Sequence, residues 1–131
     1  MGGHRVTIAL WCVLAAGLLP YPFAMAAKWS SRFDNARPRE YFAQTSGWRQ
    51  RAHWVQLNSY ESFPLFASAV IVAHLLAGAQ ASADALALAF VALRLIFGLC
   101  YLVNLATLRS LAWLAGQACS IALFVLAARA A

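Results

Sequence analysis

A few polar side chains interrupt long apolar stretches of this 131-residue chain, and their spacing indicates shared surfaces. On a helix that turns about 100° per residue, Arg51, Trp54, Asn58 and Glu61 fall within an arc of about 80°. They therefore lie on one helix face. A charged group near the centre of a membrane helix costs roughly 2.5–3.5 kcal/mol, so we expect this face to meet protein and not lipid.

A second polar set follows later in the chain. Arg94 and Tyr101 are seven positions apart, which stacks them on one helix face two turns from each other. Arg109 follows about two turns further on. The three arginines Arg51, Arg94 and Arg109 outnumber the carboxylate of Glu61, so an anionic ligand would supply the missing negative charge.

A structural role is the alternative for the same residues. Glu61 and Arg94 would then neutralise each other as a buried ion pair that fixes the helix register, and Asn58 would add hydrogen bonds. We predict no metal site, because His53 and His74 have no partnering Cys or Asp at ligand spacing.

Long apolar stretches with few charges indicate where the chain crosses a membrane, although Glu61 interrupts the second stretch and Arg94 the third. About 20 apolar residues span a bilayer, and four stretches are long enough. We predict helices over residues 6–27, 47–78, 84–107 and 109–129, with a basic loop at 28–46. Pro20 and Pro22 are expected to bend the first helix. A cleaved signal peptide is the alternative for that stretch, with His4 and Arg5 as its basic end.

The composition excludes several classes of protein. With 63% hydrophobic and 11% charged residues, the chain is neither a water-soluble domain, nor disordered, nor a coiled coil. The sequence predicts a single membrane domain over residues 1–131. Its expected fold class is all-α, an integral membrane four-helix bundle with up-down connections and left-handed packing.

The charge distribution predicts an orientation in the membrane. The chain has ten Lys and Arg against four Asp and Glu, a net charge of +6. Six basic residues lie between the first two apolar stretches: Lys28, Arg32, Arg37, Arg39, Arg49 and Arg51. By the positive-inside rule this segment faces the cytoplasm, and both termini lie on the other side. No nucleic-acid motif is present, and we expect no nucleic-acid partner.

The run from Asn58 to Phe66 reads N-S-Y-E-S-F-P-L-F. It resembles the N-x-x-E-x-F-P-L-F core of the second helix in the membrane-associated proteins in eicosanoid and glutathione metabolism, or MAPEG family. Arg51 and Gln56 also match, seven and two residues before the Asn. Three later positions resemble the family too: Arg94, Tyr101 and Arg109. The chain is identified as a bacterial-type member that resembles leukotriene synthase and microsomal glutathione transferase.

The resemblance implies a homotrimer in the bacterial inner membrane, with glutathione as co-substrate between neighbouring subunits near the cytoplasmic side. The implied glutathione-binding residues are Arg51, Gln56, Asn58, Glu61, Arg94 and Tyr101. Arg51 and Arg94 would hold the carboxylates, and Asn58 and Glu61 the amine and amide groups. Arg109 would be the catalytic residue, because a guanidinium favours the thiolate of a thiol whose pKa is about 8.5.

The chain departs from the family pattern at three places. Trp54 stands where the synthases carry a second Arg, and an indole donates one hydrogen bond but cannot neutralise a carboxylate. Phe97 replaces a pocket Tyr. The spacing from Tyr101 to Arg109 differs by one residue, which would rotate Arg109 by about 100° unless a turn between the helices absorbs the shift.

The sequence therefore leaves two functions open. The first is a membrane-embedded transferase or peroxidase that uses glutathione to conjugate or reduce a lipophilic small molecule. The second is a non-catalytic membrane protein of the same fold, in which Trp54 has converted the pocket to a site for lipid or another apolar ligand. Whether the protein is an enzyme stays open at this stage.

Overall fold

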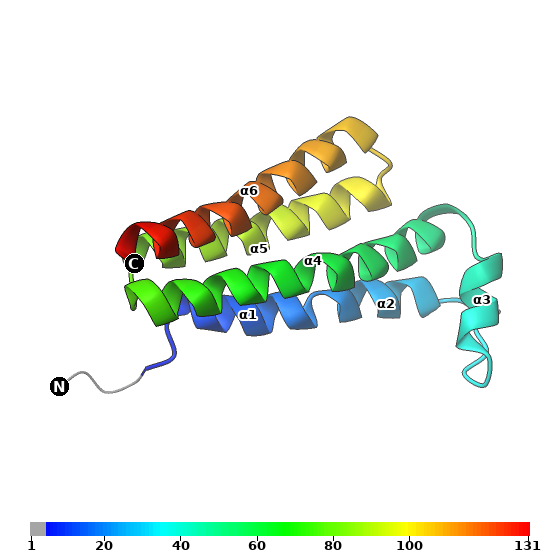
Figure 1. Cartoon of the computed structure of the whole chain (residues 1–131). Helices are drawn as coiled ribbons and strands as arrows, with labels where there is room; N and C mark the ends of the chain where they lie inside the picture. Colours follow the sequence, from blue (N-terminus) through cyan, green and yellow to red (C-terminus); the bar gives the residue numbers. More distant parts are fainter. Residues whose placement is uncertain (1–4) are drawn as a thin grey trace.

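The computed structural model describes residues 5–131, and these form six helical segments and no strand. His4 of the candidate signal peptide lies outside the described residues. Four spans are long and apolar enough to cross a membrane: Ile8–Lys28, Gly47–Ala77, Ala81–Leu102 and Ala106–Ala130. They pack lengthwise as a bundle (Figure 1). The predicted all-α membrane bundle of four spans is confirmed.

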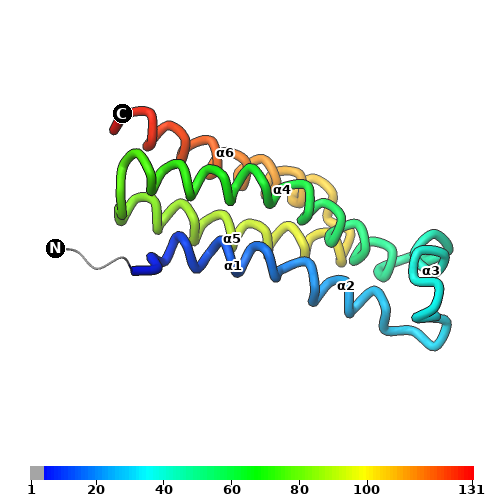
Figure 2. Tube along the Cα trace, turned by 60° about the horizontal axis from the view of Figure 1, so that its bottom comes forward, coloured from blue at the N-terminus to red at the C-terminus, as the bar shows by residue number. Residues whose placement is uncertain are grey.

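Two prolines divide the first span into α1 (Ile8–Leu18) and α2 (Pro20–Lys28). Pro20 and Pro22 have no backbone N–H, so the helix loses two hydrogen bonds there. Leu19, between α1 and α2, keeps helical angles, and its N–H donates to the carbonyl of Ala15 at 2.9 Å. The chain therefore continues along the bundle through the break, as Figure 2 shows.

The other three spans are α4 (Gly47–Ala77), α5 (Ala81–Leu102) and α6 (Ala106–Ala130). The third span begins and ends earlier than the predicted 84–107. Asn104 sets its end, since this residue has a φ of 63° and the next N–H, of Leu105, donates to the carbonyl of Cys100 at 2.8 Å. A residue in the left-handed region commonly ends a helix this way, and Asn tolerates it better than most.

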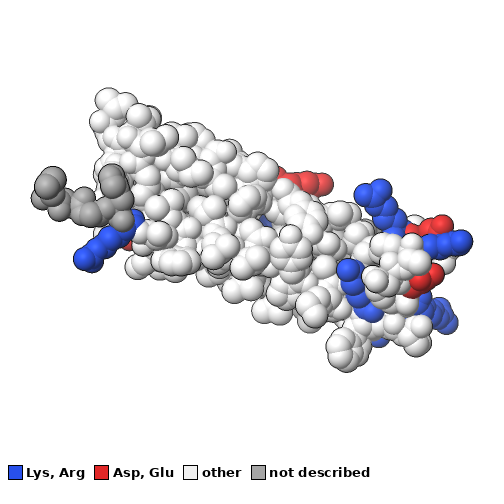
Figure 3. Space-filling view, turned by 90° about the horizontal axis from the view of Figure 1, so that it is seen from below, with Lys and Arg blue, Asp and Glu red and all other residues white. Residues whose placement is uncertain are grey.

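The predicted basic loop at 28–46 contains the short helix α3 (Pro38–Gln44), which crosses the end of the bundle (Figure 1). The Tyr41 hydroxyl donates to the carbonyl of Ala27 at 2.6 Å and so fastens α3 to the end of α2. Lys and Arg side chains gather over this part of the molecule, whereas the flank of the bundle is largely uncharged (Figure 3). We call this the basic end of the bundle.

The core is uneven along the bundle. Its larger cluster lies toward the opposite end, where the Phe66 and Phe90 rings stack with centroids 3.9 Å apart among many buried alanines. Small residues let helices approach closely, which favours packing inside a membrane. The smaller cluster, nearer the basic end, is built around Phe23, Val55 and Phe97. The buried core is therefore smaller toward the basic end of the bundle.

Hydrogen bonds join the beginning of α1 to α4 and α5 at the end of the bundle opposite the basic end, which we call the opposite end. The carboxylate of Asp84 accepts the N–H of Ala9 at 2.8 Å, which places a negative charge at the first turn of α1. The Thr7 hydroxyl lies 2.7 Å from Nε2 of His74, whose Nδ1 lies 2.8 Å from the carbonyl of Val70. Because a carbonyl only accepts, Nδ1 carries the proton and Nε2 accepts from Thr7.

Candidate functional site

Arg94 lies inside the protomer. Its side chain is 3% exposed, and Nη2 donates to the Ser59 hydroxyl at 3.2 Å. The Ser59 hydroxyl in turn donates to the carbonyl of Val55 at 2.7 Å. The guanidinium carbon is 4.2 Å from the centre of the Phe97 ring, so a cation–π contact covers the charge. Arg94 thus joins α5 to α4 without a carboxylate partner.

The alternative of a Glu61–Arg94 ion pair is wrong for the protomer. The ion pair found among residues 5–131 is Arg37 with Glu40, at 3.5 Å. Glu61 lies on the exposed side of α4, while Arg94 points inward to Ser59. The physical reason is rotation about the helix axis, because Ser59 lies about 200° from Glu61 on α4 and only the serine faces α5.

Arg51 joins the beginning of α4 to the end of α5. Its Nε and Nη2 donate to the carbonyl of Leu102 at 3.3 and 3.1 Å. This carbonyl belongs to the last turn of α5, where carbonyl groups have no partner within the helix. Arg51 therefore caps α5 and remains half-buried at the basic end.

Arg109 approaches from the first turn of α6. Its guanidinium carbon lies 4.4 Å from the centre of the Tyr101 ring. Tyr101 also meets Phe97, with ring centroids 5.5 Å apart and edge to face, and Trp54, with centroids 6.1 Å apart. The turn at Asn104 separates α5 from α6, and across it Arg109 packs on the Tyr101 ring.

These residues line one hollow of about 290 Å³ at the basic end. Its lining residues are Arg51, Trp54, Cys100, Tyr101, Asn104, Leu105, Ala106 and Arg109. We call it the Arg51–Arg109 hollow. Among residues 5–131, two guanidinium groups and no carboxylate face it, while Trp54 and Tyr101 provide aromatic walls. Such a set suits an anion that carries planar or apolar parts.

The structure thus brings together Arg51, Tyr101 and Arg109 from the predicted set. Arg94 lies behind them, linked through the Phe97 and Tyr101 rings. The other three predicted residues lie outside the hollow, on α4: Gln56, Asn58 and Glu61.

Those three residues of α4 have different surroundings. Asn58 is half-buried, and its Oδ1 lies 3.4 Å from the Ser62 hydroxyl. Glu61 is exposed one turn further on, so both are open to a neighbour of the protomer. Gln56 points elsewhere on α4, where its Nε2 donates to the Tyr60 hydroxyl at 3.0 Å and its Oε1 lies 3.2 Å from Nδ1 of His53.

Sequence reasoning missed two partners of this site. Ser59 holds Arg94, but a serine within a helix carries no sequence signal that separates this role from a bond to its own backbone. The carbonyl of Leu102 holds Arg51, and a main-chain group of this kind becomes available only where a helix ends. The Asn104 turn was the one detectable signal for that end.

Comparison with protein families agrees with the fold. The MAPEG family model matches residues 8–129, and the chain belongs to this family. Comparison with curated proteins finds no match. The protein is therefore an integral membrane protein of a family whose members act in glutathione or lipid metabolism.

Proposed function

We propose that the protein binds glutathione in the Arg51–Arg109 hollow and joins it through its sulfur to a lipophilic electrophile. Alternatively, two glutathione molecules are oxidised to the disulfide while a lipid peroxide is reduced to the alcohol and water. The observation that carries this proposal is the pair of guanidinium groups, Arg51 and Arg109, facing a hollow lined by no carboxylate. Glutathione has two carboxylates and an acidic thiol, so it supplies the negative charge that the site lacks.

Arg109 has the catalytic role in this proposal. Its guanidinium would stabilise the thiolate, and the thiol proton would leave to water when glutathione binds. In the transferase reaction, the thiolate forms a carbon–sulfur bond with the electrophile, and the displaced group leaves with the bonding pair. An arginine is suited to this task because it stays protonated, so no protein side chain need act as a base.

Arg51 and Tyr101 are proposed to position the co-substrate. Arg51 retains Nη1 free of protein hydrogen bonds in the structure described, while Nε and Nη2 hold Leu102. That leaves it able to bind one carboxylate while capping α5. Arg94 is proposed to add positive charge behind the aromatic wall, since its Nη2 donates to Ser59 inside the protomer.

We further propose a homotrimer in which a neighbouring subunit covers the exposed polar face of α4. Asn58 and Glu61 lie on that face within an apolar span, where lipid is a poor solvent for a carboxylate. Glutathione bound between subunits would place its amine and amide groups next to these two side chains. Gln56 would bind a different part of the glutathione, because its side chain lies elsewhere on α4. The proposed location is a bacterial inner membrane, with the basic end cytoplasmic and both termini outside.

Trp54 favours one competing function. Trp54 is 41% exposed and lines the Arg51–Arg109 hollow, where a third guanidinium would otherwise strengthen anion binding. In this alternative the hollow holds a lipid or another apolar ligand, and the protein is not a catalyst.

A titration of the purified protein in neutral detergent distinguishes the two functions. Glutathione is expected to raise the ultraviolet absorbance of a thiolate and to increase the unfolding temperature, because a ligand of the native state stabilises it. S-hexylglutathione serves as the control and should stabilise the protein without a thiolate signal. If millimolar glutathione produces neither effect, glutathione is not the ligand, and stabilisation by an apolar amphiphile alone would support the alternative.

A further inference from the structure

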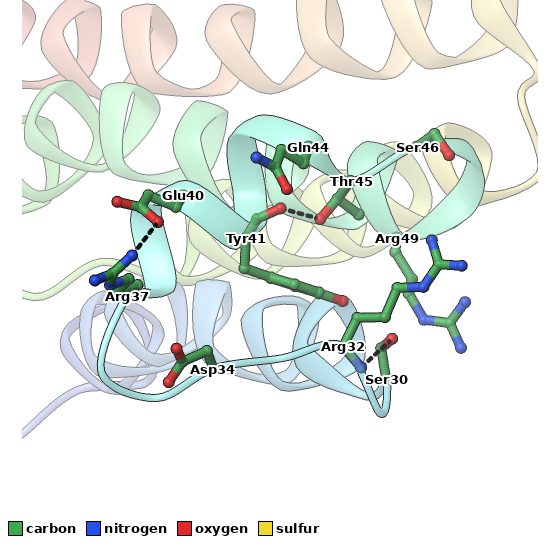
Figure 4. Close-up of a pocket in the computed structure, with 10 residues that line it drawn as sticks. All are labelled: Ser30, Arg32, Asp34, Arg37, Glu40, Tyr41, Gln44, Thr45, Ser46 and Arg49. Carbon is green, nitrogen blue, oxygen red and sulfur yellow. Dashed lines mark hydrogen bonds and ion pairs between the residues drawn. The ribbon is translucent and has the colours of Figure 1, made fainter.

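A second and separate hollow lies among the polar residues of the basic end. It has a volume of about 440 Å³ and is enclosed by the 28–46 connection, α3 and the beginning of α4 (Figure 4). It shares no lining residue with the Arg51–Arg109 hollow. We call it the loop pocket. Three arginines face it, Arg32, Arg37 and Arg49, together with two carboxylates, Asp34 and Glu40.

The carboxylates of the loop pocket are engaged with local partners. Glu40 pairs with Arg37 at 3.5 Å, and an Oδ1 of Asp34 accepts the N–H of Ala36 at 2.9 Å. In Figure 4 Asp34, Glu40 and Arg37 lie on one side of the pocket. Among residues 5–131 neither carboxylate forms an ion pair with Arg32 or Arg49, because Glu40 pairs with Arg37.

Arg32 and Arg49 extend toward the other side of the pocket, away from both carboxylates (Figure 4). Arg49 uses Nε to donate to the carbonyl of Trp29 at 2.8 Å, and this contact leaves its two terminal nitrogens for a ligand. The Ser30 hydroxyl beside them accepts the N–H of Arg32 at 3.2 Å and keeps its own proton to donate. Two guanidinium forks with an adjacent hydroxyl form a typical set of donors for phosphate.

The position of the loop pocket places it at the level of lipid headgroups. The first apolar span ends at Lys28, and the second begins at Gly47, close to Arg49. The pocket therefore lies at the membrane-facing limit of both spans. Trp29 next to it is 77% exposed, and Trp48 packs on Arg49 with the guanidinium carbon 4.5 Å from its ring. Exposed tryptophans at span ends are typical of the membrane interface.

We propose that the loop pocket binds the phosphate of an anionic phospholipid headgroup in the leaflet at the basic end. Arg32 and Arg49 hold the phosphate oxygens, with the Ser30 hydroxyl as a further donor. Tyr41 keeps the pocket at headgroup depth through its bond to Ala27. This site is independent of glutathione binding, and it would seat each protomer on an anionic lipid.

The test measures lipid binding to the purified protein in neutral detergent micelles. Short-chain phosphatidylglycerol is titrated while the unfolding temperature is recorded, with phosphatidylcholine of the same chain length as the neutral lipid. The wild-type protein is expected to be stabilised by the anionic lipid and much less by the neutral one. Arg32→Gln should weaken phosphatidylglycerol binding about tenfold, the value of a direct hydrogen bond to a charged group.

Arg39→Gln is the matched control. Arg39 lies in α3 of the same segment and carries the same charge, but it does not line the loop pocket. It should bind phosphatidylglycerol as the wild type does, and Arg32→Lys, which keeps the charge, should lose less than Arg32→Gln. Equal losses in Arg32→Gln and Arg39→Gln would mean only general attraction to the lipid surface and would overturn the pocket.

Inorganic phosphate distinguishes the two sources of a phosphate group. At the same concentration it should stabilise the wild-type protein far less than phosphatidylglycerol does. If inorganic phosphate stabilises equally well and Arg32→Gln abolishes the effect, the pocket serves a soluble phosphate compound, and the lipid proposal is wrong. No preference for phosphatidylglycerol over phosphatidylcholine in the wild-type protein would also overturn it.

Discussion

At the opposite end of the bundle the polar groups of Thr7, His74 and Asp84 are engaged with one another or with the backbone, whereas at the basic end several cations face open hollows. Asp84 holds the first turn of α1, and His74 has a partner for each ring nitrogen. At the basic end, Arg51 and Arg109 face the Arg51–Arg109 hollow, and Arg32 faces the loop pocket.

This difference suggests that the polar groups of the opposite end stabilise the fold and that those of the basic end bind ligands. A polar group whose hydrogen bonds are satisfied within the protein contributes to folding and has little left for a ligand. A guanidinium that retains free donors in a hollow can exchange water for an anion. We therefore expect substitutions at the opposite end to change unfolding, and substitutions at the basic end to change ligand binding.

The largest expected effect is on the thiolate. Arg109→Gln removes the charge proposed to stabilise it, and the loss of one such group typically costs about a hundredfold or more. Thiolate formation by bound glutathione, followed by ultraviolet absorbance, should therefore nearly vanish. Arg129→Gln, at the exposed far end of the same helix, is the control and should keep the wild-type signal. Equal signals from the two variants would remove Arg109 from the mechanism.

The next effect tests how closely α2 and α5 pack against each other. A Cβ on Gly98 of α5 would overlap the buried ring of Phe23 on α2. Overpacking of this kind costs about 1–3 kcal/mol, so Gly98→Ala should lower the free energy of unfolding by that amount. A Cβ on Gly116 would instead lie 3.7 Å from the Phe90 ring, an ordinary contact.

Gly116→Ala is consequently the matched control, and it should be neutral or slightly stabilising because alanine favours the helix. Thermal unfolding in detergent compares the two variants. If Gly98→Ala unfolds at the wild-type temperature, α2 and α5 do not pack as closely as the structure has them.

A smaller effect tests whether Trp54 in the aromatic wall limits glutathione binding. Trp54→Arg adds a third guanidinium to the Arg51–Arg109 hollow and should strengthen glutathione binding about tenfold, the value of one hydrogen bond to a charged group. Isothermal titration measures the affinity. Trp54→Gln removes the indole without adding charge, so a similar gain in both variants would show that steric relief, not charge, controls the site.

The smallest effect belongs to the opposite end. Asp84→Ala removes the acceptor for the N–H of Ala9 and should cost about 1 kcal/mol of stability, as the loss of a helix cap does. Glutathione affinity should not change. Asp34→Ala in the exposed 28–46 connection is the control, and its unfolding should stay within about 0.5 kcal/mol of the wild type. Weaker glutathione binding by Asp84→Ala, with unfolding unchanged, would contradict the separation of the two ends.

Much of the fold could be predicted because membrane spans depend on local composition. Apolar composition with few charges over about 20 residues located the four spans, and Pro20 with Pro22 located the break in the first of them. The end of the third span was placed at 107, beyond Leu102, because the residues after Leu102 remain mostly apolar. Asn104 ends the helix by its backbone conformation, which hydropathy does not record.

The candidate site was predictable only in part. Helical spacing correctly put Arg51 and Trp54 on one face of α4, and both line the Arg51–Arg109 hollow. The same reasoning offered Glu61 as a partner for Arg94, although the two side chains diverge. Spacing fixes which residues share a face of one helix, but the rotation of that helix against its neighbours depends on packing.

The sequence by itself determined the membrane class, the four apolar spans and membership of the MAPEG family, since each depends on residue types in order along the chain. Only the tertiary structure decided that Arg94 turns inward to Ser59 and that Arg109 meets Tyr101. These contacts join different helices, and they depend on how the helices rotate and where a turn ends one of them. The turn at Asn104 and the dense packing of small residues fix both.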